Sequence, residues 1–148
     1  MRIIKLGIIS LVFFAIMITM ISFLFPSHVR ISKAIDINAT NEQVLAQLKD
    51  TSNWKNWYPG ADSLLPAVDL SFNDSLVGFQ QIREGKKAEE GIHVIKTERP
   101  GITTVQWYMD IKLHWYPWEK FSSLLLESRY GPFMEKGLGK MKSFLEKQ

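Results

Sequence analysis

Apolar and polar residues alternate along HVRISKAIDIN, residues 28–38. Side chains of a strand point in turn to its two faces, so this alternation predicts a strand with one buried face. Lys33 is the exception, because it falls among the apolar residues of that face: Val29, Ile31, Ile35 and Ile37.

A helix is expected after this strand. Thr40 is followed three residues later by Gln43, which is the spacing of a capping box. Val44 and Leu48 then supply apolar positions one helical turn apart. We therefore expect a helix of about ten residues that ends near residues 50–51.

The next segment, SNWKNWYPG at residues 52–60, is rich in aromatic side chains. Trp54 and Trp57 are three residues apart, so in a short helix or turn they share one face. They and Tyr58 have three alternative roles: packing in a core, lining the rim of a ligand site, or contacting a membrane. Packing is expected first, because each buried aromatic side chain removes about 150–250 Å² from water.

Four strand-sized runs follow between residues 64 and 116: LLPAVDLSF, SLVGFQQIRE, EGIHVIKTE and ITTVQWYMDIKLHWY. Turn-forming or charged residues at 73–74, 84–87 and 100–101 separate them. The last run alternates most clearly, with a bulky apolar side made of Val105, Trp107, Met109, Ile111, Leu113 and Trp115. Its other side is largely polar, as in an antiparallel sheet that is covered on one face.

Two helices are expected to close the chain, beginning at Pro117 and Pro132, because proline suits the first turn of a helix. Residues 130–131 would separate them. The second helix has one apolar stripe: Met134, Leu138, Met141 and Leu145. Gly137 and Gly139 each cost about 1 kcal/mol relative to alanine inside a helix, which indicates either a close approach to the sheet or room for a guest molecule.

Residues 6–25 contain no charge and no proline. A helix of that length, at about 1.5 Å per residue, matches the roughly 30 Å hydrocarbon core of a bilayer. The following FLFPSHV lacks a small-x-small cleavage site, so we interpret residues 1–26 as a retained single-pass membrane anchor, with a cleaved signal peptide as the alternative. Arg2 and Lys5 favour a cytoplasmic N-terminus and an extracytoplasmic domain.

Residues 27–148 are long enough for one domain with its own core. All 15 acidic residues lie there with 16 of the 18 basic ones (18 minus Arg2 and Lys5), which gives a formal charge of +1 (16 − 15). This balance and the lack of a basic stripe exclude nucleic acid as an expected partner. The chain has no cysteine, so it forms no disulfide in either compartment.

No catalytic set is apparent. His28, His93 and His114 are isolated and have no metal-ligand spacing, and no serine lies in a GxSxG motif. Neither a phosphate loop nor a dinucleotide fingerprint occurs, so no metal or cofactor is expected. Asp110 and Glu98 are the candidate acids, but Asp110 lies on the polar side of its strand and Glu98 beside a turn.

Two segments carry a family resemblance: SKAIDINATNEQVLAQLKDTSNWKNWYP, and VQWYMDIKLHWYPWEKFSSLLLESRYGPFMEKGLGKMKSFLEK. They resemble the SRPBCC superfamily of START-like and polyketide cyclase-like proteins. The resemblance implies an α+β helix-grip fold, in which a curved antiparallel sheet wraps around a long C-terminal helix and encloses an apolar cavity. Such proteins normally have six strands after the helix pair, whereas about four runs are present here, so we expect a shortened sheet.

By the same resemblance, Trp54 and Trp57 would lie near the mouth of the cavity. The residues expected to line it are Trp54, Trp57, Tyr58, Trp107, Met109, Ile111, Trp115, Met134, Leu138 and Met141. We expect a membrane-anchored, non-enzymatic domain that binds a hydrophobic small molecule or lipid. The alternatives are a cyclase-like enzyme that uses the cavity, and a partner-binding or sensory module with a filled core.

Overall fold

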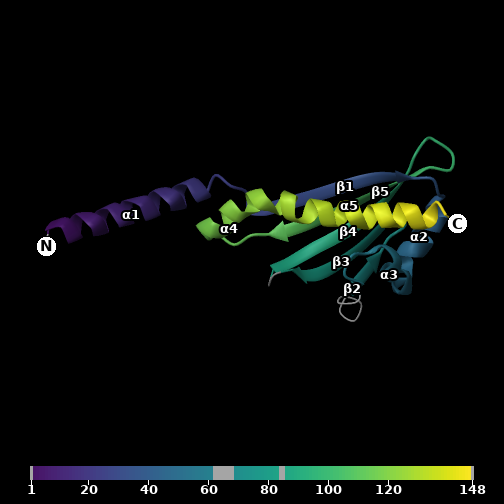
Figure 1. The fold of residues 1–148 in the computed structure, drawn as a ribbon, viewed down its shortest axis with the longest axis horizontal. Coiled ribbons are helices and arrows are strands. Elements are labelled where there is room, and N and C mark those ends of the chain that lie inside the picture. Colours follow the sequence, from purple (N-terminus) through teal and green to yellow (C-terminus); the bar gives the residue numbers. More distant parts are fainter. Residues whose placement is uncertain (1, 62–68, 84–85, 148) are drawn as a thin grey trace.

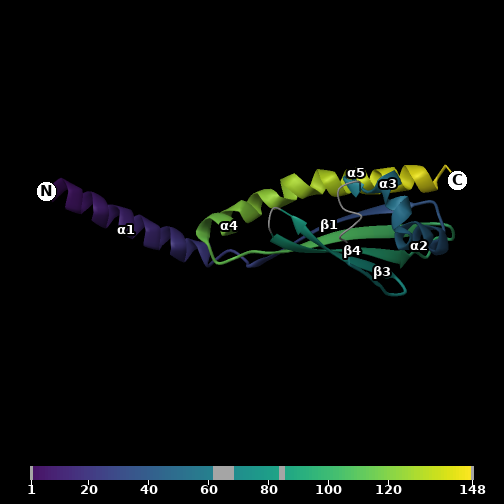
Figure 2. The same ribbon diagram turned by 90° about the horizontal axis from the view of Figure 1, so that it is seen from below.

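A computed structural model describes residues 2–61, 69–83 and 86–147, in which a long C-terminal helix lies along one face of an antiparallel sheet (Figures 1 and 2). The sheet has five strands in the order β1-β5-β4-β3-β2. They are β1 (His28–Ile37), β2 (Asp69–Phe72), β3 (Leu76–Arg83), β4 (Lys86–Lys96) and β5 (Thr103–Lys112). The α+β helix-grip architecture is thereby confirmed.

Each of the four expected runs contains a strand, and the first run is described only from residue 69 onward. The break expected at 84–87 was too long, because Lys86 and Lys87 already belong to β4 and pair with Arg83 and Ile82 of β3. Cross-strand pairing therefore extends β4 through a charged stretch that looks like a loop in the sequence. Within the described ranges, four strands follow the helix pair, one in each of the four expected runs.

The helices between β1 and β2 also match the prediction. Thr40 caps α2 (Asn41–Lys49): its hydroxyl accepts from the Gln43 backbone, and the Gln43 side chain accepts from the Thr40 N–H. A 3-10 turn, η1 (Thr51–Asn53), then leads into α3 (Trp54–Trp57). The capping box thus fixes the start of α2, and α2 leads through η1 to the aromatic residues of α3.

The C-terminal region differs from the prediction. After α4 (Pro117–Ser122) and the 3-10 turn η3 (Ser123–Leu125), a single helix, α5 (Leu126–Leu145), runs through Pro132 without a break at Tyr130 and Gly131. Proline inside a helix removes one backbone hydrogen bond. Burial of both Tyr130 and the Met134 stripe favours the continuous helix over that loss. The ribbon from α4 to α5 is curved (Figure 2), in keeping with an internal proline.

Lys33, the charged exception on the apolar face of β1, points towards α5. Its Nζ atom lies 2.8 Å from Glu127 Oε1 and 3.1 Å from Glu135 Oε1. Gly131 lies between these two acids, and a Cβ atom there would approach Lys33 Cε to 3.2 Å. Contacts with the two carboxylates raise the pKa of Lys33. The lysine therefore joins the sheet to α5 at a position where an apolar residue was expected.

The core lies between the sheet and α5. On β5 the predicted buried side is confirmed from Val105 to Leu113, and all four stripe residues of α5 are buried. The prediction was wrong for Trp115, which follows the end of β5 at Lys112 and is 61% exposed. The alternation stops there because the pairing of β5 with β1 also stops at Lys112.

The apolar helix α1 (Arg2–Ser22) projects from one end of the domain, and the C-terminus lies at the other end (Figure 1). The most apolar stretch of 18 residues in α1 has a mean hydropathy of 2.5, and none of these residues is buried. By length and composition α1 can cross a membrane, and a signal sequence meets the same criterion. The helix ends before Pro26, as expected.

The two glycines of α5 have different surroundings and provide a matched pair of variants. A Cβ at Gly137 would lie 2.7 Å from Trp107 Cζ3 and 3.0 Å from Pro59 Cδ, whereas one at Gly139 would have no neighbour within 4 Å among the described residues. We expect Gly137→Ala to destabilise the protein by about 1–3 kcal/mol through overpacking. Gly139→Ala should instead stabilise it by up to about 1 kcal/mol through helix propensity.

Denaturant unfolding of the full chain in one detergent, followed by circular dichroism, measures both effects. Equal stabilisation by both substitutions would show that α5 does not approach Trp107 closely.

Candidate functional site

Six aromatic side chains from four elements form one layer between the sheet and α5. They are Trp54, Trp57 and Tyr58 from α3 and its C-cap, Phe79 from β3, Trp107 from β5 and Phe133 from α5. We call this set the aromatic layer. Its ring centroids are 4.9 Å apart for Trp54 and Phe79, 5.2 Å for Tyr58 and Trp107, and 5.6 Å for Trp107 and Phe133. Large aromatic side chains therefore fill the space between the sheet and α5.

The three aromatic residues of the segment 52–60 are all at most 2% exposed. Trp54 also donates from Nε1 to the Leu48 carbonyl at 2.9 Å, which fixes α3 against the end of α2. Of the three alternatives, packing therefore describes these residues in this structure. Rim and membrane contacts both require exposed side chains, and these are buried.

Trp57 has a different hydrogen-bonding environment from Trp54. Its side chain is buried, and its Nε1 has no hydrogen-bond acceptor among the described residues. A buried donor without an acceptor costs about 1–3 kcal/mol. An acceptor atom on a guest molecule could satisfy this indole N–H from within the layer.

Glu90 supplies the layer with a carboxylate. It lies on β4 between the buried residues Ala88 and Ile92 and is only 2% exposed. Its Oε2 accepts from Trp107 Nε1 at 3.0 Å and from the Tyr58 hydroxyl at 3.4 Å. A buried carboxylate among aromatic rings can orient a polar atom of a guest molecule or exchange a proton with it.

The sequence analysis missed Glu90 because the expected strand began at this residue, where a charged side chain is ordinary. With β4 beginning at Lys86, Glu90 is instead a mid-strand residue on the buried face. The available signal was the alternation of Ala88, Glu90, Ile92 and Val94, which becomes visible only when Lys86 and Lys87 are counted as strand.

The other residues expected to line a cavity fall into two groups. Most are buried between the sheet and α5, and these are Met109, Ile111, Met134, Leu138 and Met141. Trp115 is not among them, because it is exposed near α4. The structure thus brings nine of the ten candidates into one interior region and leaves one outside.

In the part of the chain that the structure describes, hollows with volumes of about 230, 350 and 630 Å³ are lined by residues other than these ten candidates. The smallest is the nearest to the aromatic layer, because Phe79 and Glu90 contribute to its wall. Its remaining wall residues come from β2 to β5: Ser71, Leu76, Gly78, Gln80, Glu89 and Tyr108.

The acids singled out from the sequence do not join the aromatic layer. Asp110 forms a bidentate pair with Arg30, at 2.8 Å to Nε and 2.6 Å to Nη2. The hydrogen bond from Arg30 lowers the pKa of Asp110, so this carboxylate is ionised at neutral pH. Glu98 is exposed in the turn between β4 and β5.

The histidines also lie elsewhere. His114 is exposed and contacts Glu119 at 3.1 Å, and His93 lies beside the Tyr108 ring at 5.4 Å. In the part of the chain that the structure describes, no group of three or more His, Cys, Asp or Glu residues could hold a metal ion.

Comparison with known proteins identifies the fold. No family model and no curated protein matches the chain. Among solved structures, it is similar to norcoclaurine synthase of Thalictrum flavum, with a TM-score of 0.57, 11% identity and coverage of 81% of this chain and 95% of that one. A START superfamily protein from Mycobacterium smegmatis gives a TM-score of 0.51 with 14% identity over 81% and 98% of the two chains.

A third similar structure is the di-domain ARO/CYC protein BexL, with a TM-score of 0.51 and 12% identity, covering 81% of this chain and 50% of that one. These likenesses, together with the five-stranded sheet and α5, define the chain as a protein with the START-like helix-grip fold.

Substitutions at Glu90 test its place in the layer. We expect Glu90→Ala to destabilise the protein by about 1–3 kcal/mol, because the Trp107 indole N–H loses its acceptor. Glu90→Gln should cost less, because an amide oxygen can still accept this hydrogen bond. Denaturant unfolding of both variants gives the comparison, and an exposed control, Glu89→Gln, should change little. An equal loss of stability in Glu90→Ala and Glu90→Gln would contradict a hydrogen-bonding role for Glu90.

The Arg30–Asp110 pair predicts a pH dependence. The pKa of Asp110 is lower in the folded state, so its stabilising effect is complete above the ordinary aspartate pKa and is lost as the pH falls through the folded value. Asp110→Asn should therefore be less stable than the parent protein at pH 7, and the difference should shrink below about pH 4.

Thermal unfolding between pH 3 and 7 measures this difference. Arg30→Gln should show the same narrowing, because it removes the other half of the pair. If the difference in stability between the parent protein and these variants did not change with pH, the Arg30–Asp110 pair would not be the cause.

Proposed function

We propose that this protein is a membrane-anchored, non-enzymatic binding domain for a hydrophobic small molecule or lipid. The guest lies at the aromatic layer, between the sheet and α5. The observation that carries the proposal is the presence of two polar groups in this apolar interior: the Glu90 carboxylate and the Trp57 indole N–H, which has no acceptor among described residues. Ligand sites commonly combine apolar walls with a few polar groups that fix orientation.

Affinity in such a site comes mainly from apolar surface removed from water, at about 25 cal/mol per Å². Five of the six layer side chains are at most 2% exposed, so a guest must displace some of them. Methionine suits this role because its side chain is flexible and adapts to irregular shapes. Met109, Met134 and Met141 all lie in the same interior. Phe133 packs against this interior and is only partly buried.

We further propose that α1 anchors the domain and that the domain lies on the extracytoplasmic side. The support is the length and apolar character of α1, with Arg2 and Lys5 at its N-terminal end. A domain held at a bilayer can collect a hydrophobic guest from the membrane, where the guest is concentrated.

A second candidate is an enzyme of cyclase type, and Glu90 is the observation that favours it. The carboxylate is buried and lies 3.4 Å from the Tyr58 hydroxyl, so a proton could move between Glu90 and a guest. Two of the similar structures are named a synthase and an ARO/CYC protein. With this activity, Glu90→Gln would retain unreacted substrate, and the molecule extracted from it would differ from that of the parent protein.

The binding proposal is tested by purifying the full chain in mild detergent from a lipid-containing host. Native mass spectrometry measures the occupancy of any bound molecule, and solvent extraction gives its chemical class. A stoichiometric adduct that is the same in the parent protein and in Glu90→Gln supports binding without turnover. A protein with no adduct, from several hosts, would contradict the proposal and favour a partner-binding module with a filled core.

Trp57→Phe and Trp54→Phe are matched variants for the position of the guest. Both indoles are 1% exposed, but among the described residues only the Trp54 N–H has an acceptor, the Leu48 carbonyl. We expect Trp57→Phe to weaken guest binding by up to about tenfold, the value of one hydrogen bond of about 1.4 kcal/mol. Trp54→Phe should mainly lower the melting temperature. Equal effects of both variants on binding would place the guest elsewhere.

A further inference from the structure

Exposed apolar side chains gather at the end of the domain that faces α1. They come from α4 and the residues on either side of it, and we call them the α4 patch: Trp115, Trp118, Phe121, Leu124 and Leu125. Trp118 is 67% exposed and Leu125 is 68% exposed. Single apolar residues are normal on a protein surface, but a contiguous group marks a contact surface.

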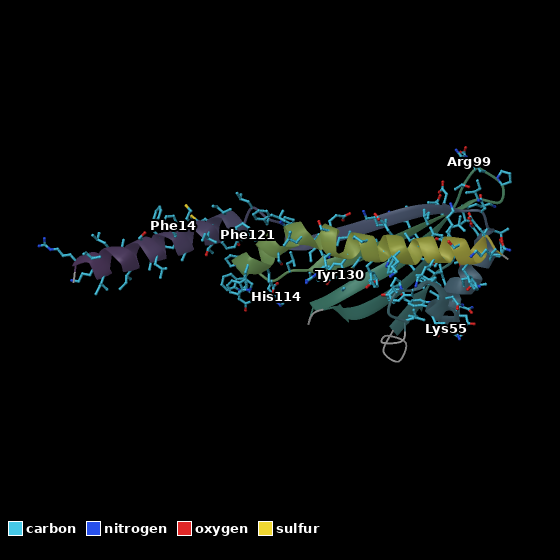
Figure 3. The ribbon with its side chains drawn as sticks, in the orientation of Figure 1. Phe14, Lys55, Arg99, His114, Phe121 and Tyr130 are labelled. Carbon is cyan, nitrogen blue, oxygen red and sulfur yellow. The ribbon has the colours of Figure 1, made fainter. Side chains whose placement is uncertain are left out.

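This patch is continuous with the C-terminal end of α1. The Phe25 and Phe121 rings meet edge to face at 5.2 Å. Phe23 and Leu24 are exposed beside them, as is α1 along nearly its whole length. Figure 3 shows Phe121 beside the end of α1 that carries the chain into the domain, whereas Lys55 lies at the far end of the domain.

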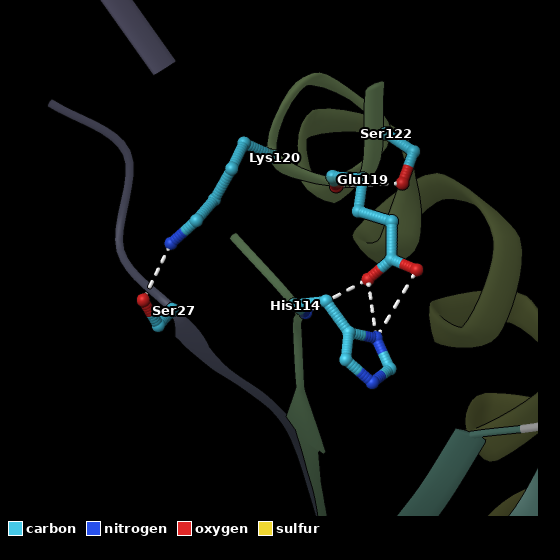
Figure 4. Close-up of polar contacts among 5 residues, drawn as sticks. All are labelled: Ser27, His114, Glu119, Lys120 and Ser122. Atoms are coloured by element: carbon cyan, nitrogen blue, oxygen red, sulfur yellow. Dashed lines mark hydrogen bonds and ion pairs between the residues drawn. The ribbon is translucent and has the colours of Figure 1, made fainter. Parts of the chain in front are cut away.

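Ser27 holds the two regions together. Its carbonyl accepts from the Leu113 N–H at 2.9 Å, and its hydroxyl accepts from Lys120 Nζ of α4 at 2.5 Å (Figure 4). Lys120 also donates to the Phe25 carbonyl at 3.2 Å. We call these contacts the Ser27 junction. They use the lysine ammonium to attach α4 to the segment that leaves α1.

The N-terminal end of α4 is also fixed. Glu119 accepts from the backbone N–H of His114 at 2.8 Å and contacts its imidazole Nδ1 at 3.1 Å (Figure 4). The Tyr116 and Trp118 rings stack at 4.8 Å with an interplanar angle of 6°. The Tyr116 and Trp118 rings are therefore held together by their own stacking contact.

The length of α1 predicts where the α4 patch would lie relative to a bilayer. At about 1.5 Å per residue, its 21 residues span roughly the 30 Å hydrocarbon thickness. When α1 spans the bilayer, Ser22 lies at the membrane–water interface, and α4 lies beside it. Tryptophan and tyrosine prefer this level, because one end of each ring system is apolar and the other is polar.

We propose that the α4 patch is a second membrane contact, immersed in the lipid–water interface of the bilayer that α1 enters, and that it fixes the orientation of the domain. This inference rests on α1 being the anchor. A bilayer is the occupant to which the geometry points, because the patch meets the exposed apolar surface of α1 at the contact between Phe25 and Phe121. The opposite end of the domain, with α2, α3 and the C-terminus, then faces away from the membrane (Figure 1).

The absence of cysteine allows a direct test with single nitroxide labels on the full chain in phosphatidylcholine vesicles. Leu124→Cys reports on the patch, Phe14→Cys on the middle of α1, and Lys55→Cys on the far end of the domain. Power-saturation electron paramagnetic resonance compares collisions with oxygen, which enriches in lipid, and with a water-soluble nickel complex. We expect oxygen to dominate at positions 14 and 124 and nickel to dominate at position 55.

The outcomes separate the inference from the anchor on which it depends. Lipid-like values at 14 with water-like values at 124 would overturn the α4 contact and leave the anchor intact. Water-like values at both positions would overturn both. Protection at 124 that disappears on dilution of protein in excess lipid would assign the patch to a second copy of the chain and also overturn the proposal.

The double variant Trp118→Glu/Leu125→Glu gives an independent measurement. Both side chains are exposed, so the fold should be retained, as checked by circular dichroism. The label at position 124 should then shift from lipid-like to water-like values, while the label at position 14 is unchanged. An unchanged label at 124 in the folded double variant would contradict the proposal.

Discussion

The close packing of α5 against the sheet at Trp107 and Gly137 determines the rest of the domain. Only a residue without a side chain lets the Trp107 ring lie this near to the helix backbone. At this distance α3 can pack against both layers, and Pro59 fills the remaining space beside Gly137. The interior is consequently built from ring contacts rather than from aliphatic packing alone, and Glu90 can be buried because an indole N–H is available to it.

Much of the fold could be predicted from local patterns. The capping box of Thr40 and Gln43 depends only on the spacing of two residues, so the sequence shows it directly. The apolar stripe on α5 follows the helical repeat and is equally visible. Pro132 was misinterpreted because its local preference for a helix start is outweighed by burial of residues on both sides. The sequence does not explain Lys33, because its partners Glu127 and Glu135 lie on a helix that comes much later in the chain.

The candidate site was predicted in part for the same reason. Aromatic residues of segment 52–60 and of β5 could be chosen from size and periodicity, and they do share one interior. Glu90 required knowledge of where β4 begins, which is set by pairing with β3 and not by the composition of Lys86 and Lys87. Trp115 was assigned to the wrong surface because the partner strand of β5 ends at His28, opposite Lys112.

The Ser27 junction has a mechanical consequence. A domain joined to a membrane helix by a loose linker tumbles independently and loses orientational entropy whenever it engages a target. Here Leu113 and Lys120 bind the chain within a few residues of the end of α1, which restricts the rotation of the domain relative to the helix. With α1 in a bilayer, as proposed, these contacts would pass the tilt of the helix on to the sheet, so that a change in membrane thickness would change the direction in which the domain points.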